Sequence, residues 1–258
     1  MRVLIAESKT MANHELHVAP EDYRRHHPRL DSIATLFMKK WSEWPLGEIA
    51  SALKVSSSMA AAFKRMAYNF SYKETGRKAL DAFTGVVFRA FDYDSLSGDR
   101  KRYADSSINI VSSLYGLLKG DDIVKAYRLD FNTPIAPTGE TMAKYWKPLI
   151  TPMLMDCMRA SDDNELLDLL PSEGAKCLNW QWIKREMRVI KVDFKSIADG
   201  GNLRTPHATL LKKFRGLLLR EIVQNKIKSF KELLALESDS MCIDPESDPT
   251  SGKITIFV

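Results

Sequence analysis

Short apolar segments that alternate with helical patterns constrain the fold of this chain more than any other feature. "RVLIA", "MRVIKVDF" and "KITIFV" are rich in β-branched residues and have the length of strands. Between them lie periodic stretches, of which the strongest, "HATLLKKFRGLLLREIVQNKI", carries one apolar stripe along a helix. Strands separated by helices predict a mixed α/β (α+β) architecture with a central mixed sheet and surrounding helices.

The organisation of the chain favours one domain over residues 1–258. Helical periodicity from Leu30, a second helix near Pro45 and a third in "SSSMAAAFKRMAYNF" predict a helical section at about 29–83. "GETMAKYWKPLITPMLMDCMRA" predicts a further helix. The β-branched "GVVF" marks a change of character after a helix ending at Phe83, and "YRLDF" favours a short strand. Neither an internal repeat nor a low-complexity linker divides the sequence.

Composition and charge exclude several classes of protein. No run approaches eighteen apolar residues, and the start lacks a signal-peptide pattern, so we expect a cytoplasmic protein without a membrane partner. Three scattered cysteines and five histidines form no metal-ligand pattern, so we expect neither a metal nor a cofactor. The net charge of +5 is modest, but lysines and arginines concentrate between Arg204 and Lys231. One face of the C-terminal half should therefore be positive.

The familiar catalytic and phosphate-binding motifs are absent from the sequence. It contains no GxxxxGK[ST], no GxGxxG after a strand and no GxSxG. The neighbouring acids Asp121 and Asp122, like Asp162 and Asp163, are more typical of solvated turns than of paired catalytic carboxylates. Any chemistry must therefore come from residues that are scattered along the chain.

Four patches combine polar groups with a glycine or a strand end. Lys9 and Thr10 follow the first strand, where open α/β sheets commonly bind ligands. Gly116 and Gly120 permit backbone shapes in which amides converge on a phosphate oxygen, and Arg128 suits a forked phosphate contact. The residues concerned are Lys9 and Thr10; Tyr115, Gly116, Lys119 and Gly120; Tyr127 and Arg128; and, on the polar side of the amphipathic helix, Lys212, Lys213, Arg215 and Arg220. For each patch, a surface loop, a buried turn or a solvated helix face is the alternative.

Together these patches resemble the YaaA peroxide-stress family, a family long classed as uncharacterised. "ESKT", "DAFTGVVFRAF", "SSLYGLLKGDDIVKAYRLDF", "MAKYWKPLIT" and "LLKKFRGLLLREIVQNKI" follow in the family's order, from Met1 to about Leu236. The resemblance implies a single-domain mixed α/β fold with a basic cleft and a helix-hairpin-helix element, which would lie at about 100–130. It also implies DNA binding, including bulged duplex, and a link to lower free iron under hydrogen peroxide stress.

The resemblance carries over unevenly from motif to motif. The family's "SPAKT" keeps only its lysine and threonine here, as Lys9 and Thr10, and Gly120 stands where the hairpin has a proline. The family's "NLASxEY" becomes "DLLPSEG", in which Glu173 is kept and Lys176 follows. Its asparagine, serine and tyrosine are replaced by Asp168, Pro171 and Gly174. An activity that depends on those groups would be weakened in this chain.

Two functions from different classes follow. The first is a DNA-binding stress protein that holds double-stranded or bulged DNA by its phosphates and so limits iron-dependent damage. The second is an enzyme or small-ligand binder for an anionic, nucleotide- or nucleobase-like molecule around Lys9, Arg128, Glu173 and Arg215. A scaffold whose basic helix meets an acidic partner is a third reading. Direct iron coordination is not expected, because no compact histidine and carboxylate cluster is present. The sequence leaves the oligomeric state and any enzymatic activity open.

Overall fold

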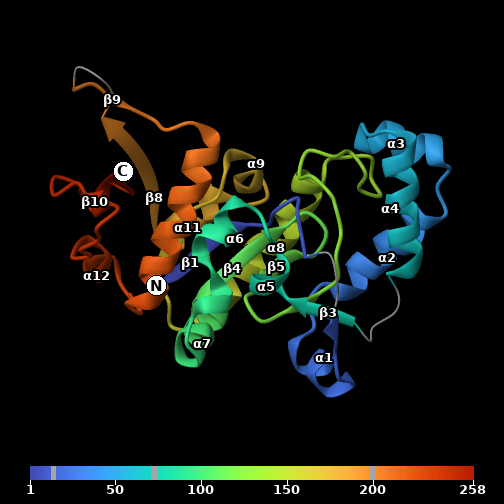
Figure 1. Ribbon diagram of the computed structural model, residues 1–258, viewed down its shortest axis with the longest axis horizontal. Helices are drawn as coiled ribbons and strands as arrows, with labels where there is room; N and C mark the ends of the chain where they lie inside the picture. Colours follow the sequence, from blue (N-terminus) through green and yellow to red (C-terminus); the bar gives the residue numbers. More distant parts are fainter. Residues whose placement is uncertain (13–15, 71–74, 198–200) are drawn as a thin grey trace.

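A mixed sheet runs through the middle of the molecule (Figure 1). The computed structural model describes residues 1–12, 16–70, 75–197 and 201–258. In the described part of the chain, the sheet has the order β10 (Cys242–Ile243), β11 (Lys253–Phe257), β8 (Arg188–Ile197), β7 (Glu165–Asp168), β1 (Arg2–Ala6), β4 (Ile108–Ser112) and β5 (Gly116–Lys119), with β9 (Leu203–Arg204) paired to β8. The sequence-based prediction of a mixed α/β fold is therefore confirmed, as are its strands at β1, β8 and β11.

Strand β1 is parallel to both of its neighbours and is buried along its whole length. Val3 lies opposite Ile108 of β4 on one side and Leu167 of β7 on the other. Such a strand needs apolar side chains on both faces, which explains the unbroken "VLIA". From β1 the chain first adds β4 on one side and later β7 on the other. The reversal creates a crevice beyond the carboxyl end of β1, the usual place for a ligand site in a parallel sheet.

The helical section forms a group at one end of the molecule (Figure 1). Its main helices are α2 (Asp31–Ser42), α3 (Leu46–Leu53) and α4 (Ser57–Asn69), preceded by α1 (Pro20–His26) and followed by α5 (Ala79–Ala82). Phe37, Trp41 and Phe63 are buried between α2 and α4, with the Trp41 and Phe63 rings 5.9 Å apart. A small sheet of β2 (Leu16–His17), β3 (Thr75–Lys78) and β6 (Ile123–Val124) lies beside this group. The helices predicted from Leu30 onward are thus confirmed.

"GVVF", whose β-branched residues suggested the end of helical structure, instead begins helix α6 (Val86–Phe91). It packs closely against α11 (Ala208–Gln224), the strongest predicted helix. A Cβ atom added at Gly216 would come within 2.2 Å of the Val87 carbonyl oxygen. Burial against α11 therefore outweighs the weak helix propensity of the two valines. "YRLDF" likewise is not a strand, because the chain from Tyr127 to Phe131 has no ladder partner among the described residues.

The expected helix-hairpin-helix element at 100–130 is not formed. Helix α7 (Gly98–Ser107) leads directly into the antiparallel hairpin of β4 and β5, and the next described helix is α8 (Met142–Ala160). The apolar run from Ile108 to Leu118 is long enough for two buried strands, and it forms β4 and β5 of the central sheet. Two helices joined by a short turn do occur in the helical section, where residues 54–56 link α3 to α4.

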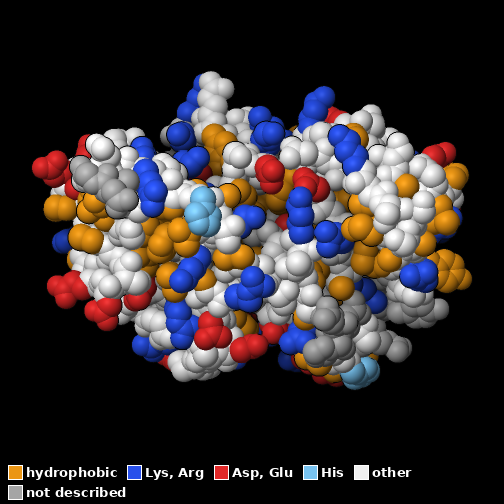
Figure 2. All heavy atoms as spheres, turned by 45° about the horizontal axis from the view of Figure 1, so that its top comes forward, with side chains coloured by type: hydrophobic (Ala, Val, Ile, Leu, Met, Phe, Trp, Pro, Cys, Tyr) orange, Lys and Arg blue, Asp and Glu red, His pale blue; other side chains and the backbone are white. Residues whose placement is uncertain are grey.

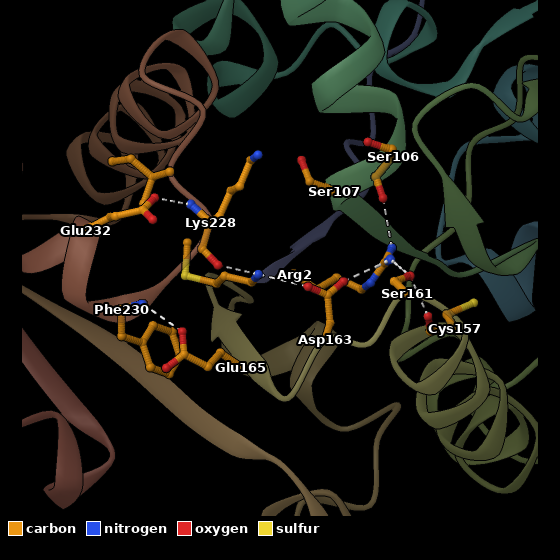
Figure 3. A network of polar contacts seen from close by, with 12 residues as sticks. Arg2, Ser106, Ser107, Cys157, Ser161, Asp163, Glu165, Lys228, Phe230 and Glu232 are labelled. Atoms are coloured by element: carbon orange, nitrogen blue, oxygen red, sulfur yellow. Dashed lines mark hydrogen bonds and ion pairs between the residues drawn. The ribbon is translucent and has the colours of Figure 1, made fainter.

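A polar network lies at the amino-terminal end of β1, on the side of the sheet away from the crevice (Figure 3). The Arg2 guanidinium donates to the Asn109 side-chain oxygen at 3.0 Å and pairs with Asp163 at 3.2 Å. The Met1 amino group donates to Asp163 at 2.8 Å and to the Lys228 carbonyl oxygen at 2.6 Å. The short helices α9 (Ser172–Ala175), α10 (Trp180–Glu186) and α12 (Phe230–Leu234) complete the fold. No helix in the described ranges has the length and apolar character needed to cross a bilayer.

Candidate functional site

A pocket of about 360 Å³, here called the strand-end pocket, opens beyond the carboxyl end of β1. It is lined by residues 5–10, 85–89 and 129–131, by Leu169, Pro171 and Glu173, and by Lys212 and Arg215. Its floor is therefore the end of β1, and its walls come from α6, α9 and α11. Figure 2 shows lysine and arginine side chains on both sides of a central hollow, with acidic side chains among them.

The charges of the strand-end pocket are mixed. Lys9, Arg89, Lys212 and Arg215 contribute cations, whereas Glu7, Asp130 and Glu173 contribute carboxyl groups. The expectation of a basic cleft is therefore too simple, because the pocket offers acceptors and acid–base groups as well as positive charge. Such a lining suits a ligand that carries both an anion and hydrogen-bond donors.

Glu7 is the most constrained polar group in the strand-end pocket. Its carboxylate accepts a hydrogen bond from the Ser113 amide at 2.9 Å and further hydrogen bonds from the hydroxyls of Ser113 and Tyr127. The Tyr127 hydroxyl also lies 2.6 Å from the Ser112 oxygen. Because Ser112 ends β4 and Tyr127 follows β6, two separate parts of the chain fix this carboxylate at the end of β1.

Burial sets the proton affinity of Glu7. Desolvation outweighs the hydrogen bonds from Ser113 and Tyr127 and raises the pKa of the Glu7 carboxyl to about 7. Burial, with a contribution from Glu7, also raises the pKa of the neighbouring Cys177 thiol to about 12, so this cysteine is an inert thiol. Glu7 can therefore exchange a proton near neutral pH. Glu7 is not among the residues predicted from the sequence, although an acid placed directly after the first buried strand is a usable signal.

Lys9 lies where the strand-end pocket meets a second one. Its ammonium forms an ion pair with Asp130, and both residues line the two pockets. Burial alone would raise the pKa of the Asp130 carboxyl, but the Lys9 ammonium and the Asn132 amide hold it below its ordinary value. The second, helix-side pocket has about 300 Å³ and is lined by Lys9, Leu53, Val55, Met59, Ala62, Phe63, Met66, Arg128, Leu129, Asp130 and Thr133. Lys9 and Arg128 are thus the cations of a largely apolar pocket.

The loop after β1 is tied to the start of α6. The Gly85 amide donates to the Ser8 hydroxyl oxygen at 3.0 Å, and a Cβ atom at Gly85 would lie 2.5 Å from the Ser8 Cβ. Only glycine permits this close approach. The contact fixes one wall of the strand-end pocket and leaves Thr10, which the sequence singled out, exposed at its rim.

Helix α11, which packs against α6, supplies two further cations of the strand-end pocket. Lys212 is exposed, whereas Arg215 is partly buried, and desolvation lowers the pKa of its guanidinium despite the nearby Asp168. Burial raises the pKa of the Asp168 carboxyl, against the opposing charges of Lys191 and Arg215. Lys213 is also exposed but does not line the strand-end pocket. Of the four basic residues predicted on this helix, the fold brings two to the pocket.

The predicted glycine hairpin is packed into the hydrophobic core. Gly116 has a φ of +76° and packs against Trp146 and Ile150, and a Cβ atom at Gly120 would lie 2.8 Å from the Asp105 Cα atom. Tyr115 is buried, and its hydroxyl accepts the Lys125 amide at 3.0 Å. Gly116 to Lys119 pair with β4 as a ladder, so these amides do not converge on an open phosphate site.

Other predicted residues lie outside the strand-end pocket. Arg220 donates to the carbonyl oxygens of Phe91 and Asp92 at 2.9 and 3.0 Å, so it fastens α11 to the end of α6. The Lys119 side chain is exposed, and Lys176 donates to the Asn132 side chain at 3.3 Å. Arg220 and Lys119 therefore do not line the strand-end pocket with Lys9 and Lys212, contrary to the sequence-based prediction.

The three departures within "DLLPSEG" lie beside the strand-end pocket. Asp168 ends β7 and accepts the Leu170 amide at 2.9 Å, and Pro171 lines the pocket. Gly174 is buried, and a Cβ atom there would lie 3.4 Å from the Ala6 side chain. The exchanged groups thus surround the floor of the pocket. Within the described ranges, no group of three or more histidine, cysteine or acidic side chains is arranged to hold a metal ion.

Comparison with known proteins identifies the family. Residues 1–247 match the family model described as peroxide stress protein YaaA. The chain belongs to the YaaA peroxide stress protein family. This assignment confirms the resemblance seen in the sequence motifs.

Several YaaA-family relatives carry the name UPF0246 protein. One from Aliivibrio fischeri strain MJ11 is 32% identical over 210 residues, 79% of each chain. Another from Shewanella amazonensis is 32% identical over 205 residues, 77% of each chain. A third, from Francisella philomiragia, is 27% identical over 238 residues, covering 90% of this chain and 91% of the relative. The family match over residues 1–247 includes β1, the residues of the strand-end pocket and α11.

Proposed function

We propose that this YaaA-family chain acts in the peroxide stress response by binding DNA, with duplex or distorted DNA held by its backbone phosphates. The main support is the convergence of Lys9, Arg128 and Lys212, from distant parts of the sequence, on two pockets that share Lys9, Leu129 and Asp130. Cations spread along one hollow suit a polyanion better than a single small anion. Contacts of this kind position DNA without reading its sequence.

The turn between α3 and α4 supports the same proposal. Lys54 adopts a left-handed conformation with a φ of 53°, and the Ser56 hydroxyl accepts the Met59 amide at 3.4 Å. Ser57 and Ser58 are exposed at the start of the 13-residue helix α4, whose positive dipole end attracts phosphate. Val55 and Met59 line the helix-side pocket, so this turn lies at its rim. A bound DNA strand could be held there and at Lys9 together.

Protection from iron-dependent damage would then be indirect. Ferrous iron bound to DNA reduces hydrogen peroxide to hydroxide and a hydroxyl radical, and is itself oxidised to ferric iron. A protein that covers distorted DNA excludes iron from that surface. This route needs no metal ligands from the protein.

A gel-shift titration with bulged duplex tests the proposal. We expect the affinity to fall steeply between low and moderate salt, because each neutralised phosphate releases counterions. The double variant Lys212→Glu, Lys213→Glu should weaken binding by roughly tenfold or more and flatten the salt dependence by about two phosphate contacts. Equal affinity for the wild type and this variant would rule out DNA binding at α11.

The matched control is Lys228→Glu, Lys231→Glu. It changes the net charge by the same amount, but Lys228 lines a pocket at the amino-terminal edge of the sheet, far from the strand-end pocket. Its affinity should remain within about twofold to threefold of the wild type. An equal loss in both double variants would show that net charge alone, and not the proposed surface, governs the interaction.

A second candidate is an enzyme or binder for a nucleotide- or nucleobase-like molecule in the strand-end pocket. The specific observation in its favour is that Glu7, Asp130 and Glu173 line the same pocket as the cations, which phosphate binding alone does not require. A thermal-shift screen of nucleotides and nucleobases tests it. A true ligand should stabilise the wild type and the control Lys40→Ala but not Lys9→Ala. If none of the compounds stabilises the wild type, this candidate function is wrong.

A further inference from the structure

One carboxyl group lies inside a pocket whose proposed ligands are anions. We propose that the strand-end pocket is an acid–base site, in which Glu7 takes up a proton when a phosphodiester or a similar oxyanion binds beside Lys212 and Arg215. This inference rests on the proposed binding of an anion in that pocket. It assigns to Glu7 a role that the phosphate-holding cations cannot fill.

The position of the Glu7 carboxylate is fixed. It is held by the Ser113 amide at 2.9 Å and by the hydroxyls of Ser113 and Tyr127, and Ser112 in turn holds the Tyr127 hydroxyl. Ser112, Ser113 and Tyr127 are buried. The carboxylate therefore cannot turn away into solvent when a second negative charge enters the pocket.

An incoming oxyanion and an ionised Glu7 would repel each other. The titratable groups that line the strand-end pocket with Glu7 are Lys9, Arg89, Asp130, Glu173, Lys212 and Arg215. Cys177, after α9, is affected by the charge of Glu7, and Asp168, at the end of β7, acts on Arg215. The cations of the pocket attract the oxyanion, but they leave the negative charge of Glu7 in place. Protonation of Glu7 removes it and converts the carboxylate into a hydrogen-bond donor.

The energetic cost of this protonation is small. Because burial raises the pKa of Glu7 to about 7, roughly half of the molecules already carry the proton at neutral pH. A bound anion shifts the remainder, which links binding to the uptake of about half a proton at pH 7. If only the protonated form binds, affinity should be about tenfold weaker at pH 8 than at pH 6.

A purely structural Glu7 would behave differently. Its hydrogen bonds with Ser113 and Tyr127 also suit a residue that only fixes the turn after β4. In that case, occupation of the pocket would not change its protonation. Proton uptake on binding therefore separates the acid–base role from the structural one.

The experiment measures proton uptake by titration calorimetry in buffers of different ionisation enthalpy. The ligand is bulged duplex DNA without terminal phosphates, whose phosphodiesters do not titrate near neutral pH, at constant ionic strength. We expect uptake of about half a proton at pH 7 and about tenfold weaker affinity at pH 8 than at pH 6. The Glu7→Gln variant should bind with less than about twofold pH dependence.

Asp122→Asn provides the matched control. Burial raises the pKa of the Asp122 carboxyl to about 7 as well, but this residue lies in the turn after β5 and lines neither pocket. His207, at the start of α11, is present in all three proteins. Asp122→Asn should therefore keep the proton uptake of the wild type, which assigns the effect to Glu7.

The outcomes separate the two proposals. DNA binding without proton uptake, or an unchanged pH dependence in Glu7→Gln, would overturn the acid–base site and leave DNA binding intact. If the duplex does not bind, DNA binding is wrong, and sulfate then serves as the probe. Greater thermal stabilisation by sulfate at pH 6 than at pH 8, lost in Glu7→Gln, would support the acid–base site, and equal stabilisation at both pH values would overturn it.

Discussion

The hydroxyl of Tyr127 donates a hydrogen bond to the carboxylate of Glu7, across a sequence separation of 120 residues. The contact joins the end of β1 to the segment that follows β6, and it holds Glu7, which lines the strand-end pocket. Burial, the nearby Glu7 and this hydrogen bond raise the pKa of Tyr127 well above its ordinary value, so the tyrosine remains a donor. The pair therefore couples the stability of the fold to the protonation of Glu7.

The first prediction concerns the pH dependence of stability in Glu7→Gln. Because the folded pKa of Glu7 is about 7, above its ordinary 4.5, the folded state binds more protons than the unfolded state between those values. The contribution of Glu7 is thus most favourable at low pH and is lost as pH rises toward 7. From pH 5 to pH 8, Glu7→Gln should gain about 1–3 kcal/mol relative to the wild type, measured by urea unfolding.

The pKa of Asp122 is shifted in the same direction as that of Glu7, so Asp122 offers a comparison. Burial raises its pKa from 3.8 to about 7, so Asp122→Asn should also gain stability relative to the wild type as pH rises. The two residues do not touch, and their effects should add in the double variant. The free energy of unfolding should change differently with pH in the wild type and in Glu7→Gln. If it changes by the same amount in both proteins between pH 5 and pH 8, the pKa of Glu7 is not raised.

The second prediction concerns Tyr127→Phe. The substitution removes a donor from the Glu7 carboxylate and a partner from Ser112, so it should destabilise the fold by about 1–3 kcal/mol at pH 8. The loss should be smaller at pH 5, where the neutral form of Glu7 needs the donor less. Tyr68→Phe, at an exposed position, should change stability by less than about 0.5 kcal/mol. If Tyr127→Phe loses the same free energy of unfolding at both pH values, the hydrogen bond of Tyr127 does not depend on the ionisation of Glu7.

Local pattern was sufficient for much of the fold. β1, β8, β11 and the long helices α8 and α11 follow from apolar periodicity, because each buries a face that its own sequence displays. Helix α6 was harder to predict, since its valines favour a strand in isolation. Its conformation depends on close contact with Gly216, more than a hundred residues away, and such a contact leaves no local signal.

The site was predicted only in part for a similar reason. Lys9 and Lys212 could be singled out because a strand end and a helix face indicate where they point. Gly116 and Gly120 gave the same signal as a phosphate-binding hairpin, but sequence alone does not show that Trp146 and Leu80 occupy the space beside them. Glu7 was missed because its importance arises from burial by Tyr127 and Ser113, which only the fold brings to it.

The third prediction tests the contact between α6 and α11. A Cβ atom at Gly216 would lie 2.2 Å from the Val87 carbonyl oxygen and 2.7 Å from the Ala90 Cβ, so Gly216→Ala must push the helices apart. We expect a loss of about 1–3 kcal/mol or more in urea unfolding. Gly47→Ala in α3 meets nothing within 4 Å and should be neutral or stabilising by up to about 1 kcal/mol. Similar stabilities for the two variants would contradict this packing.

The fourth prediction separates structural from ligand-binding arginines. Arg220 donates to Phe91 and Asp92, and the latter adopts a left-handed conformation with a φ of 52° at the end of α6. Arg220→Met leaves these carbonyl groups without their cationic donor, so it should lower the free energy of unfolding by about 1–3 kcal/mol. DNA affinity should stay within about threefold of the wild type, since Arg220 lines neither pocket. The exposed Lys212→Met, at a residue that lines the strand-end pocket, should show the reverse, a small effect on stability with weaker DNA binding. Loss of DNA affinity without loss of stability in Arg220→Met would instead place this arginine among the phosphate contacts and extend the binding surface along α11.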